Sequence, residues 1–140
     1  MQRVPVITMP DGAVAYTHPV RVSFGDTDAA GIVYYANYLR YFEAARSELL
    51  RAHGARYADL FAQGVLMPVV ETWLRYRSPA RYDDLIDVTV WLHEVRSASV
   101  VVGCTIAREG QLLVAGGARL GCMDREGQVR PLPDVIRALG

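Results

Sequence analysis

Two carboxylates and one glycine lie close together in the segment Asp26-Thr27-Asp28-Ala29-Ala30-Gly31, between a strand-like run and a long helical pattern. A carboxylate can act on a carbonyl compound as a general base or as a nucleophile. The backbone N–H groups at a helix N-terminus have no intrahelical partners and carry partial positive charge. An acidic side chain facing such a donor forms half of an acyl-transfer site. The segment therefore predicts chemistry at a carbonyl group.

Other kinds of catalytic or metal site find little support in the sequence. No Ser-His-Asp arrangement and no G-x-S-x-G motif is visible. The two cysteines, Cys104 and Cys122, form no C-x-x-C motif and are expected to be reduced and buried. The three histidines, His18, His53 and His93, are scattered, so we expect no metal site.

Composition and charge exclude several classes of protein. The length of 140 residues suits one domain, and a hydrophobic content of 51% argues against disorder. Because 15 basic residues balance 15 acidic residues, we expect no nucleic-acid partner. The longest uncharged apolar segments are too short to cross a bilayer, and the N-terminus lacks the apolar run of a signal peptide. We therefore expect a cytoplasmic protein with no integral membrane association.

The first half of the chain predicts an arm, a strand and one long helix. Prolines and an Asp-Gly turn make residues 1–14 an irregular arm. Alternating apolar and polar residues over 20–24 predict a half-buried strand. A helical period over 37–53 predicts an amphipathic helix, for which Asn37 is a plausible N-cap and Gly54 a natural stop.

The second half predicts four more strands and a short closing helix. Alternating patterns place the strands at about 70–77, 86–92, 100–106 and 112–123. Glu109-Gly110 predicts a hairpin turn, and Gly116-Gly117 predicts a weakened or kinked last strand. Residues 133–139 are expected to form the closing helix. Short connections favour antiparallel pairing, so the fold class is α+β, with a five-stranded antiparallel sheet covered by one long helix in a single domain over residues 1–140.

The order of these elements and the string D-T-D-A-A-G-I-V-Y-Y-A-N-Y at residues 26–38 resemble the hotdog-fold acyl-CoA thioesterases. The sequence is most similar to the 4-hydroxybenzoyl-CoA thioesterase group and its Tol-Pal-associated branch, over about residues 17–136. Residues 78–84 resemble the family's linker before its third strand, and residues 96–99 resemble its basic-plus-serine turn. The resemblance implies a sheet wrapped around a central helix, hydrolysis of acyl-CoA to free acid and CoA, and a homodimer or homotetramer. It implies no cofactor, because CoA is part of the substrate.

The resemblance also assigns roles to residues of this sequence. It makes Asp28 the catalytic carboxylate, acting as base or nucleophile, and it makes the backbone N–H of Tyr35 the group that polarises the thioester carbonyl. It places Arg96 and Ser99 near CoA, and it places Arg130 near the nucleotide phosphates. The Tol-Pal-associated branch often has histidine where this chain has Tyr35, but the backbone role does not depend on the side chain.

Three further residues have two readings each. Asn37 either contacts the substrate or caps the helix. Tyr38 belongs to an aromatic stripe at helical spacing, which either lines an acyl pocket or forms part of the core. Asp26 is expected to be structural, as a turn or cap carboxylate.

Two alternatives to a thioesterase remain at this stage. A hydratase or dehydratase on the same fold needs a histidine near the helix start, and all three histidines lie outside that loop. A non-catalytic acyl-CoA binding module is disfavoured by Asp28, because a charge beside an acyl pocket is costly. The sequence leaves the acyl group open between aromatic, short-chain and medium-chain.

Overall fold

A computed structural model describes residues 7–140 of the protein, so the first six residues of the expected arm lie outside the described residues. Residues 7–14 form no helix or strand. The elements that follow in chain order are β1 (Ala15–Arg21), a short 3-10 turn (Phe24–Asp26), α1 (Asn37–Ala52), α2 (Tyr57–Ala62), β2 (Val69–Tyr76), β3 (Leu85–Val95), β4 (Ser99–Arg108), β5 (Gln111–Gly121) and α3 (Asp134–Arg137). Within residues 7–140, no helix has the length and apolar character needed to cross a membrane.

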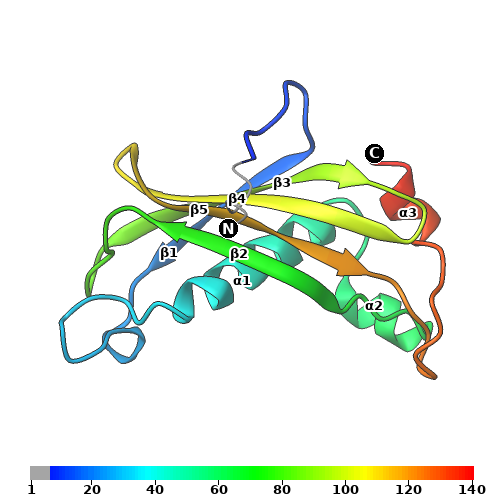
Figure 1. Cartoon of the computed structure of the whole chain (residues 1–140), viewed down its shortest axis with the longest axis horizontal. Coiled ribbons are helices and arrows are strands. Elements are labelled where there is room, and N and C mark those ends of the chain that lie inside the picture. Colours follow the sequence, from blue (N-terminus) through cyan, green and yellow to red (C-terminus); the bar gives the residue numbers. More distant parts are fainter. Residues whose placement is uncertain (1–6) are drawn as a thin grey trace, which may run out of the picture.

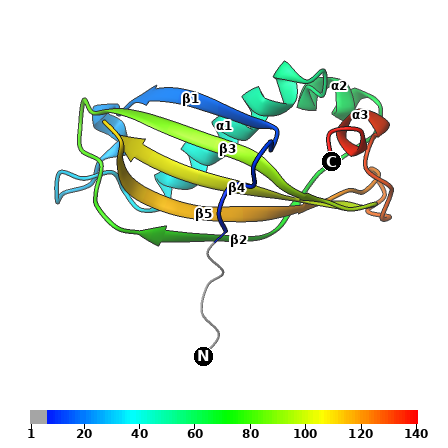
Figure 2. The same ribbon diagram turned by 90° about the horizontal axis from the view of Figure 1, so that it is seen from above.

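The five strands form one antiparallel sheet in the order β1-β3-β4-β5-β2, and this sheet curves around α1 (Figures 1 and 2). The core lies between them. The helix contributes Phe42, Ala45 and Leu49, and the sheet contributes inward residues such as Ile86 and Val88, all at most 1% exposed. The expected α+β class, with a five-stranded sheet wrapped around one long helix, is confirmed.

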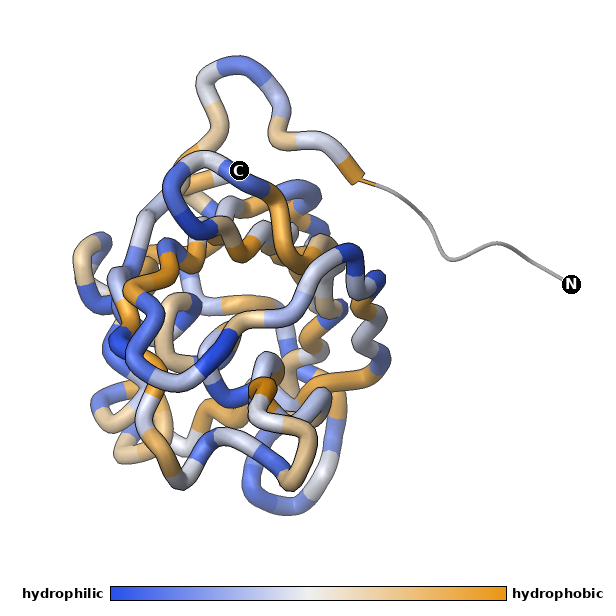
Figure 3. The backbone as a smooth tube through the Cα atoms, turned by 90° about the vertical axis from the view of Figure 1, so that its left-hand side faces the viewer, coloured by the Kyte–Doolittle hydropathy of each residue, from blue (hydrophilic) through white to orange (hydrophobic). Residues whose placement is uncertain are grey.

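The two ends of the sheet carry different parts of the chain. At one end lie the loop that leads into α1, the segment between β2 and β3, and the turn between β4 and β5 (Figure 1). At the other end lie α2, α3 and the turn between β3 and β4 (Figure 1). Figure 3 looks at the molecule from the end that carries the loop before α1. This separation decides which of the predicted site residues share one site.

The hairpin between β4 and β5 follows the prediction closely. Arg108 pairs with Gln111, so the turn has only two residues. Glu109 and Gly110 have φ angles of 51° and 79°, as a type I′ turn requires. A type I′ turn matches the right-handed twist of the strands. It needs positive φ angles at both central residues, and glycine adopts such an angle without strain.

Several expectations about element boundaries were wrong. The first strand covers residues 15–21 and not 20–24, because the Val22 N–H already bonds to Asp84 at 2.9 Å and a 3-10 turn begins at Phe24. Asn37 is the first residue of α1 and makes no cap, since Ala36 is the N-cap. The α2 helix was not expected, and the closing helix α3 spans only residues 134–137.

Gly116 and Gly117 do not kink β5, which pairs in unbroken register with β2 at both residues. They are needed because the neighbouring strand comes close. A Cβ atom built on Gly116 would lie 2.0 Å from the Trp73 carbonyl oxygen. The glycines therefore allow close approach and do not interrupt the strand.

The burial of α1 predicts a contrast between two leucines of that helix. Leu49 is fully buried against the sheet, whereas Leu39 is 38% exposed. We expect Leu49→Ala to lower the free energy of unfolding by about 2–5 kcal/mol, because it removes core contacts and leaves a cavity. Leu39→Ala should cost about 1 kcal/mol or less. Urea unfolding of both variants measures the difference, and equal losses would contradict the described packing.

Candidate active site

Asp26 fastens the loop before α1 to the helix. Its backbone carbonyl accepts hydrogen bonds from the Tyr34 N–H and from the Asn37 side-chain amide, both at 2.9 Å. Its carboxylate accepts a hydrogen bond from the Tyr41 hydroxyl at 2.7 Å and lies 3.6 Å from the Arg40 guanidinium. Asp26 therefore has a structural role, as expected. The Asn37 amide is used in the same network and is oriented by it.

Burial and the neighbouring Asp26 carboxylate raise the pKa of Tyr41 above its ordinary value. The Tyr41 hydroxyl thus stays protonated and remains a donor at neutral pH. Because Tyr41 lies one turn into α1 and is only 7% exposed, its bond to Asp26 ties the loop to the rigid core.

Asp28 is held by its backbone and by one carboxylate oxygen. Its N–H donates to the Ile32 carbonyl, its carbonyl accepts from the Gly31 N–H, and its Oδ1 accepts from the Ala30 N–H, each at 2.9 Å. Gly31 has a φ of 78°, which glycine adopts without strain. Among the described residues, no side chain or backbone group donates to the other carboxylate oxygen, and Asp28 is exposed. That oxygen is available to a ligand or to water.

Tyr35 lies two residues before α1 and presents an available backbone donor. The Tyr34 carbonyl accepts from the Asn37 N–H at 2.8 Å, which orients the peptide group between residues 34 and 35. In a trans peptide the N–H points opposite to the carbonyl, so the Tyr35 N–H points away from that contact. In the part of the chain that the structure describes, nothing accepts a hydrogen bond from it. Sequence reasoning expected this donor at the helix start.

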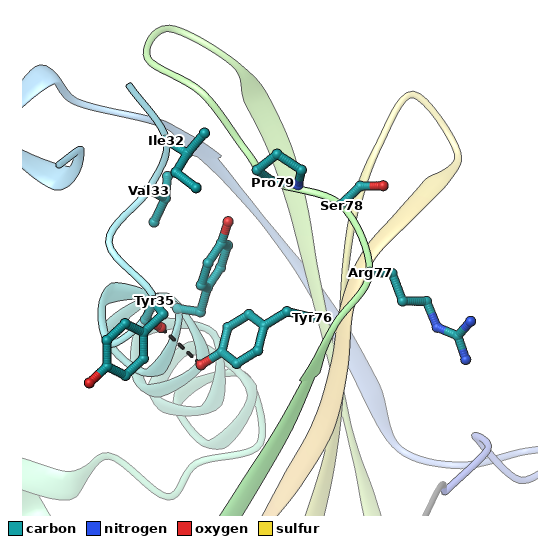
Figure 4. Close-up of a pocket in the computed structure, with 8 residues that line it drawn as sticks. Ile32, Val33, Tyr35, Tyr76, Arg77, Ser78 and Pro79 are labelled. Carbon is teal, nitrogen blue, oxygen red and sulfur yellow. Dashed lines mark hydrogen bonds between the residues drawn. The ribbon is translucent and has the colours of Figure 1, made fainter. Parts of the chain in front are cut away.

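A cavity of about 300 Å³ lies between this loop and the segment that follows β2 (Figure 4). One wall comes from residues 32–38 and the other from residues 76–79. Ile32 and Val33 face Pro79 across it, while Tyr35 and Tyr76 approach each other at its base (Figure 4). Its lining is mainly apolar and aromatic, which suits an acyl group.

Tyr38 and Tyr76 both line this cavity. Tyr38 is only 3% exposed, and its hydroxyl accepts a hydrogen bond from the Ala80 N–H at 3.0 Å. Tyr38 therefore belongs to the core and also forms part of the cavity wall, and its contact with an acyl group stays a prediction. Sequence reasoning did not include Tyr76 in the site, and alternation within a strand carries no signal that would have selected it.

An ion pair supports the wall formed after β2. The Arg108 guanidinium contacts the Asp84 carboxylate at 2.6 Å and the Pro79 carbonyl at 3.4 Å. The Asp84 carboxylate also accepts a hydrogen bond from the Arg81 N–H at 2.8 Å. Burial acts to raise the pKa of Asp84, but the bonds from Arg81 and Arg108 outweigh it, so the pKa of this carboxyl lies below its ordinary value.

Arg96, Ser99 and Arg130 do not join Asp28 within one chain. Arg96 and Ser99 flank the turn between β3 and β4, at the far end of the sheet (Figure 1). β3 has 11 residues and connects the two ends, a length of roughly 36 Å at 3.3 Å per residue. Arg96 is paired with Glu94 at 2.6 Å, and the Arg130 N–H bonds to the Cys122 carbonyl at 2.9 Å. Their contact with CoA stays a prediction.

Among the residues that the structure describes, no group of three or more His, Cys, Asp or Glu side chains is placed to hold a metal ion. Both cysteines are buried, and burial raises the pKa of Cys104 to about 12. A thiol with such a pKa is almost entirely protonated at neutral pH and is a poor nucleophile. Asp28 and the backbone N–H of Tyr35 lie in the loop beside the cavity, and their catalytic roles stay a prediction.

A curved antiparallel sheet around one central helix, with a carboxylate loop leading into that helix, defines a hotdog-fold protein. Residues 22–139 match the family model of the thioesterase-like superfamily, and the chain belongs to that family.

Named relatives agree with this assignment. The chain is 36% identical over 107 residues to the acyl-CoA thioester hydrolase YbgC of Escherichia coli O6:H1, covering 76% of this chain and 80% of the relative. It is 35% identical over 126 residues to the acyl-CoA thioesterase YbgC of Haemophilus influenzae, covering 88% and 92%. A solved structure of a 4-hydroxybenzoyl CoA thioesterase mutant complexed with 4-hydroxybenzoyl CoA has a TM-score of 0.83 at 25% identity, covering 91% of this chain and 99% of that chain.

The lowered pKa of Asp84 predicts how stability depends on pH. A carboxyl whose folded-state pKa lies below its unfolded value contributes stability that is present above the unfolded pKa, about 3.9, and is lost as pH falls through the folded pKa. We expect Asp84→Asn to be less stable than the wild type at pH 7, and this deficit should shrink below about pH 4. Urea unfolding at several pH values measures it. A deficit that is constant from pH 7 to pH 2.5 would contradict the assignment.

Proposed function

We propose that this protein hydrolyses acyl-CoA thioesters to a free acid and CoA, with Asp28 and the Tyr35 N–H as its reacting groups. The enzyme class, an acyl-CoA thioesterase, is supported by the family and by the named relatives. The observation that carries the proposed roles is that one short loop, whose residues 32–35 form part of the cavity wall, holds two groups with free hydrogen-bonding capacity. The Asp28 carboxylate keeps one oxygen without a described donor, and Asp28 is bonded to Ile32, which lines the cavity together with Tyr35.

The reaction needs a base or nucleophile and an oxyanion donor. As a base, Asp28 takes a proton from water, whose oxygen attacks the thioester carbon, and the Tyr35 N–H holds the negative oxygen of the tetrahedral intermediate. The C–S bond then breaks, and CoA leaves as a thiolate that takes up a proton. As a nucleophile, Asp28 instead forms a mixed anhydride with release of CoA, and water hydrolyses that anhydride. Both routes give the same products.

The size of the cavity supports a small acyl group. About 300 Å³ is at the lower end of the range for ligand pockets. Tyrosine rings form a large part of its wall, which suits a single aromatic ring or a short chain better than a long flexible chain. A solved structural relative holds 4-hydroxybenzoyl CoA. We therefore propose aromatic or short-chain acyl-CoA as the substrate.

The predicted role of Arg96, Ser99 and Arg130 in CoA binding requires a second copy of the chain. Arg96 and Ser99 flank the turn between β3 and β4 and Arg130 follows β5, and these segments lie at the opposite end of the sheet from the loop before α1 (Figure 1). Strand β2 is an edge of the described sheet, and Val70 on it is 64% exposed. An edge with unpaired backbone groups and exposed valine favours association. We therefore propose a homodimer or homotetramer in which the far end of one copy approaches the site of another.

The central test is Asp28→Asn, measured as CoA release from benzoyl-CoA, 4-hydroxybenzoyl-CoA, and short-chain and long-chain acyl-CoA. Asparagine keeps the oxygen that accepts from the Ala30 N–H, so the loop should retain its shape. We expect kcat to fall by at least about 100-fold because a base or nucleophile is lost, with the unfolding midpoint unchanged. Benzoyl or short-chain substrates should be hydrolysed faster than long-chain ones.

The matched control is Asp87→Asn, which makes the same chemical change at an exposed carboxylate on β3. Its kcat should stay within about twofold of the wild type. Near wild-type turnover by Asp28→Asn would contradict the role of Asp28. If the wild type binds acyl-CoA but hydrolyses none of the panel, the protein is a binding module and the proposed activity is wrong.

A further inference from the structure

We propose that Tyr76 is a positioning residue of this site, and that its hydroxyl holds the Tyr35 backbone so that the Tyr35 N–H keeps a fixed direction. The inference rests on the proposed function, because it assigns to Tyr76 the orientation of the group that receives the thioester oxygen. The Tyr76 hydroxyl donates to the Tyr35 carbonyl at 3.0 Å, across 41 residues of sequence, and the two residues meet at the cavity (Figure 4).

Two peptide groups flank the Tyr35 Cα atom, and each has one anchor. The group between residues 34 and 35, which carries the Tyr35 N–H, is held through its carbonyl by the Asn37 N–H at 2.8 Å. The group between residues 35 and 36 is held through its carbonyl by the Tyr76 hydroxyl. Because a peptide group is planar, fixing both groups fixes the two backbone dihedrals at Tyr35.

Packing does not replace the second anchor. The Tyr35 side chain is 62% exposed, and α1 begins only at Asn37, so neither the core nor a helical hydrogen bond fixes the Tyr35 carbonyl. Without the Tyr76 hydroxyl, the peptide group between residues 35 and 36 has no described partner for its carbonyl. It can then rotate, and the direction of the Tyr35 N–H depends on the Asn37 contact alone, with one of the two constraints on the Tyr35 backbone removed.

Tyr76 is itself well placed to act as an anchor. It is the last residue of β2, and its backbone pairs with Val114 in β5. Its ring lies 5.6 Å from the ring of Tyr38, centroid to centroid, which is a favourable aromatic distance. Burial, followed by the neighbouring Tyr38 and Tyr35, raises the pKa of Tyr76, so the hydroxyl keeps its proton at neutral pH.

A purely structural role for the same bond has different consequences. The loop is already fastened by the contacts of Asp26 with Tyr34, Asn37 and Tyr41. Loss of one half-exposed hydroxyl should therefore change the stability of the fold little. What it changes is the direction of one donor, and misplacement of a reacting group by about 1 Å can cost about 100-fold in rate.

The experiment compares Tyr76→Phe with Tyr82→Phe. Both remove only a hydroxyl, and Tyr82 lies at the same end of the molecule but packs against Phe24, outside the cavity. For Tyr76→Phe we expect kcat to fall about 10- to 100-fold, KM to change less than about threefold, and the unfolding midpoint to stay within about 2 °C. For Tyr82→Phe we expect no change in kcat. A kcat of Tyr76→Phe within twofold of the wild type would overturn the inference.

A second measurement reports on the backbone without activity. NMR order parameters of the Tyr35 and Ala36 amides should fall in Tyr76→Phe and stay unchanged in Tyr82→Phe, because only the first variant releases the Tyr35 carbonyl. If the wild type hydrolyses no thioester, the proposed function fails, and the order parameters still decide the positioning role. Unchanged order parameters in Tyr76→Phe would overturn it.

Discussion

The site depends on the hydrogen bonds that Asp26 accepts from the start of α1. Its carbonyl receives the Tyr34 N–H and the Asn37 amide, and its carboxylate receives the Tyr41 hydroxyl at 2.7 Å. A carboxylate as acceptor makes the Tyr41 bond stronger than one between neutral groups. Because Tyr41 is buried in the core, its bond to Asp26 fixes the loop that carries Asp28 to the packed helix and sheet. The contacts of the Asp26 carbonyl and carboxylate with Tyr34, Asn37 and Tyr41 therefore keep the loop in one conformation.

This constraint explains why one backbone donor stays available. The first N–H groups of a helix have no partner within the helix and are normally satisfied by a cap. Here no side-chain cap is made at the start of α1, and Asn37 reaches back to Asp26 instead. The Tyr35 N–H lies just before the helix, on a residue that lines the apolar cavity, and no described group accepts a hydrogen bond from it. The helix dipole favours negative charge at this position, which is where the oxyanion develops in the proposed mechanism.

Much of this arrangement was predictable, because periodicity and local motifs report on neighbouring residues. The period over residues 37–53 gave α1 almost to the residue, and Glu109-Gly110 gave the hairpin turn. The string at residues 26–38 placed Asp28 and Tyr35 in one loop. The predicted position of the first strand was wrong because Val22 and Phe24 continue its alternating pattern. In the structure the Val22 N–H already bonds to the Asp84 carbonyl, beyond the end of the strand.

The remainder needed three-dimensional information. Tyr76 and Tyr35 are 41 residues apart, and no local pattern encodes the bond between them. The separation of Arg96 from Asp28 also follows only from the direction of β3, which carries the turn to the far end of the sheet. Asn37 looked like an N-cap because its residue type suits one, but it is the first residue of the helix, and its side-chain amide donates to the Asp26 carbonyl. Long-range contacts of this kind decide how a site is held.

The most direct test of the account replaces the Tyr35 amide by an ester, which deletes the backbone N–H and keeps the tyrosine side chain. The measurement is kcat for acyl-CoA hydrolysis by the substituted and the unsubstituted protein. If the Tyr35 N–H holds the oxyanion, kcat should fall by about 100- to 1,000-fold, as on removal of an oxyanion donor, while the fold and KM change little. An unchanged kcat would contradict the account, because another group would then have to stabilise the thioester oxygen.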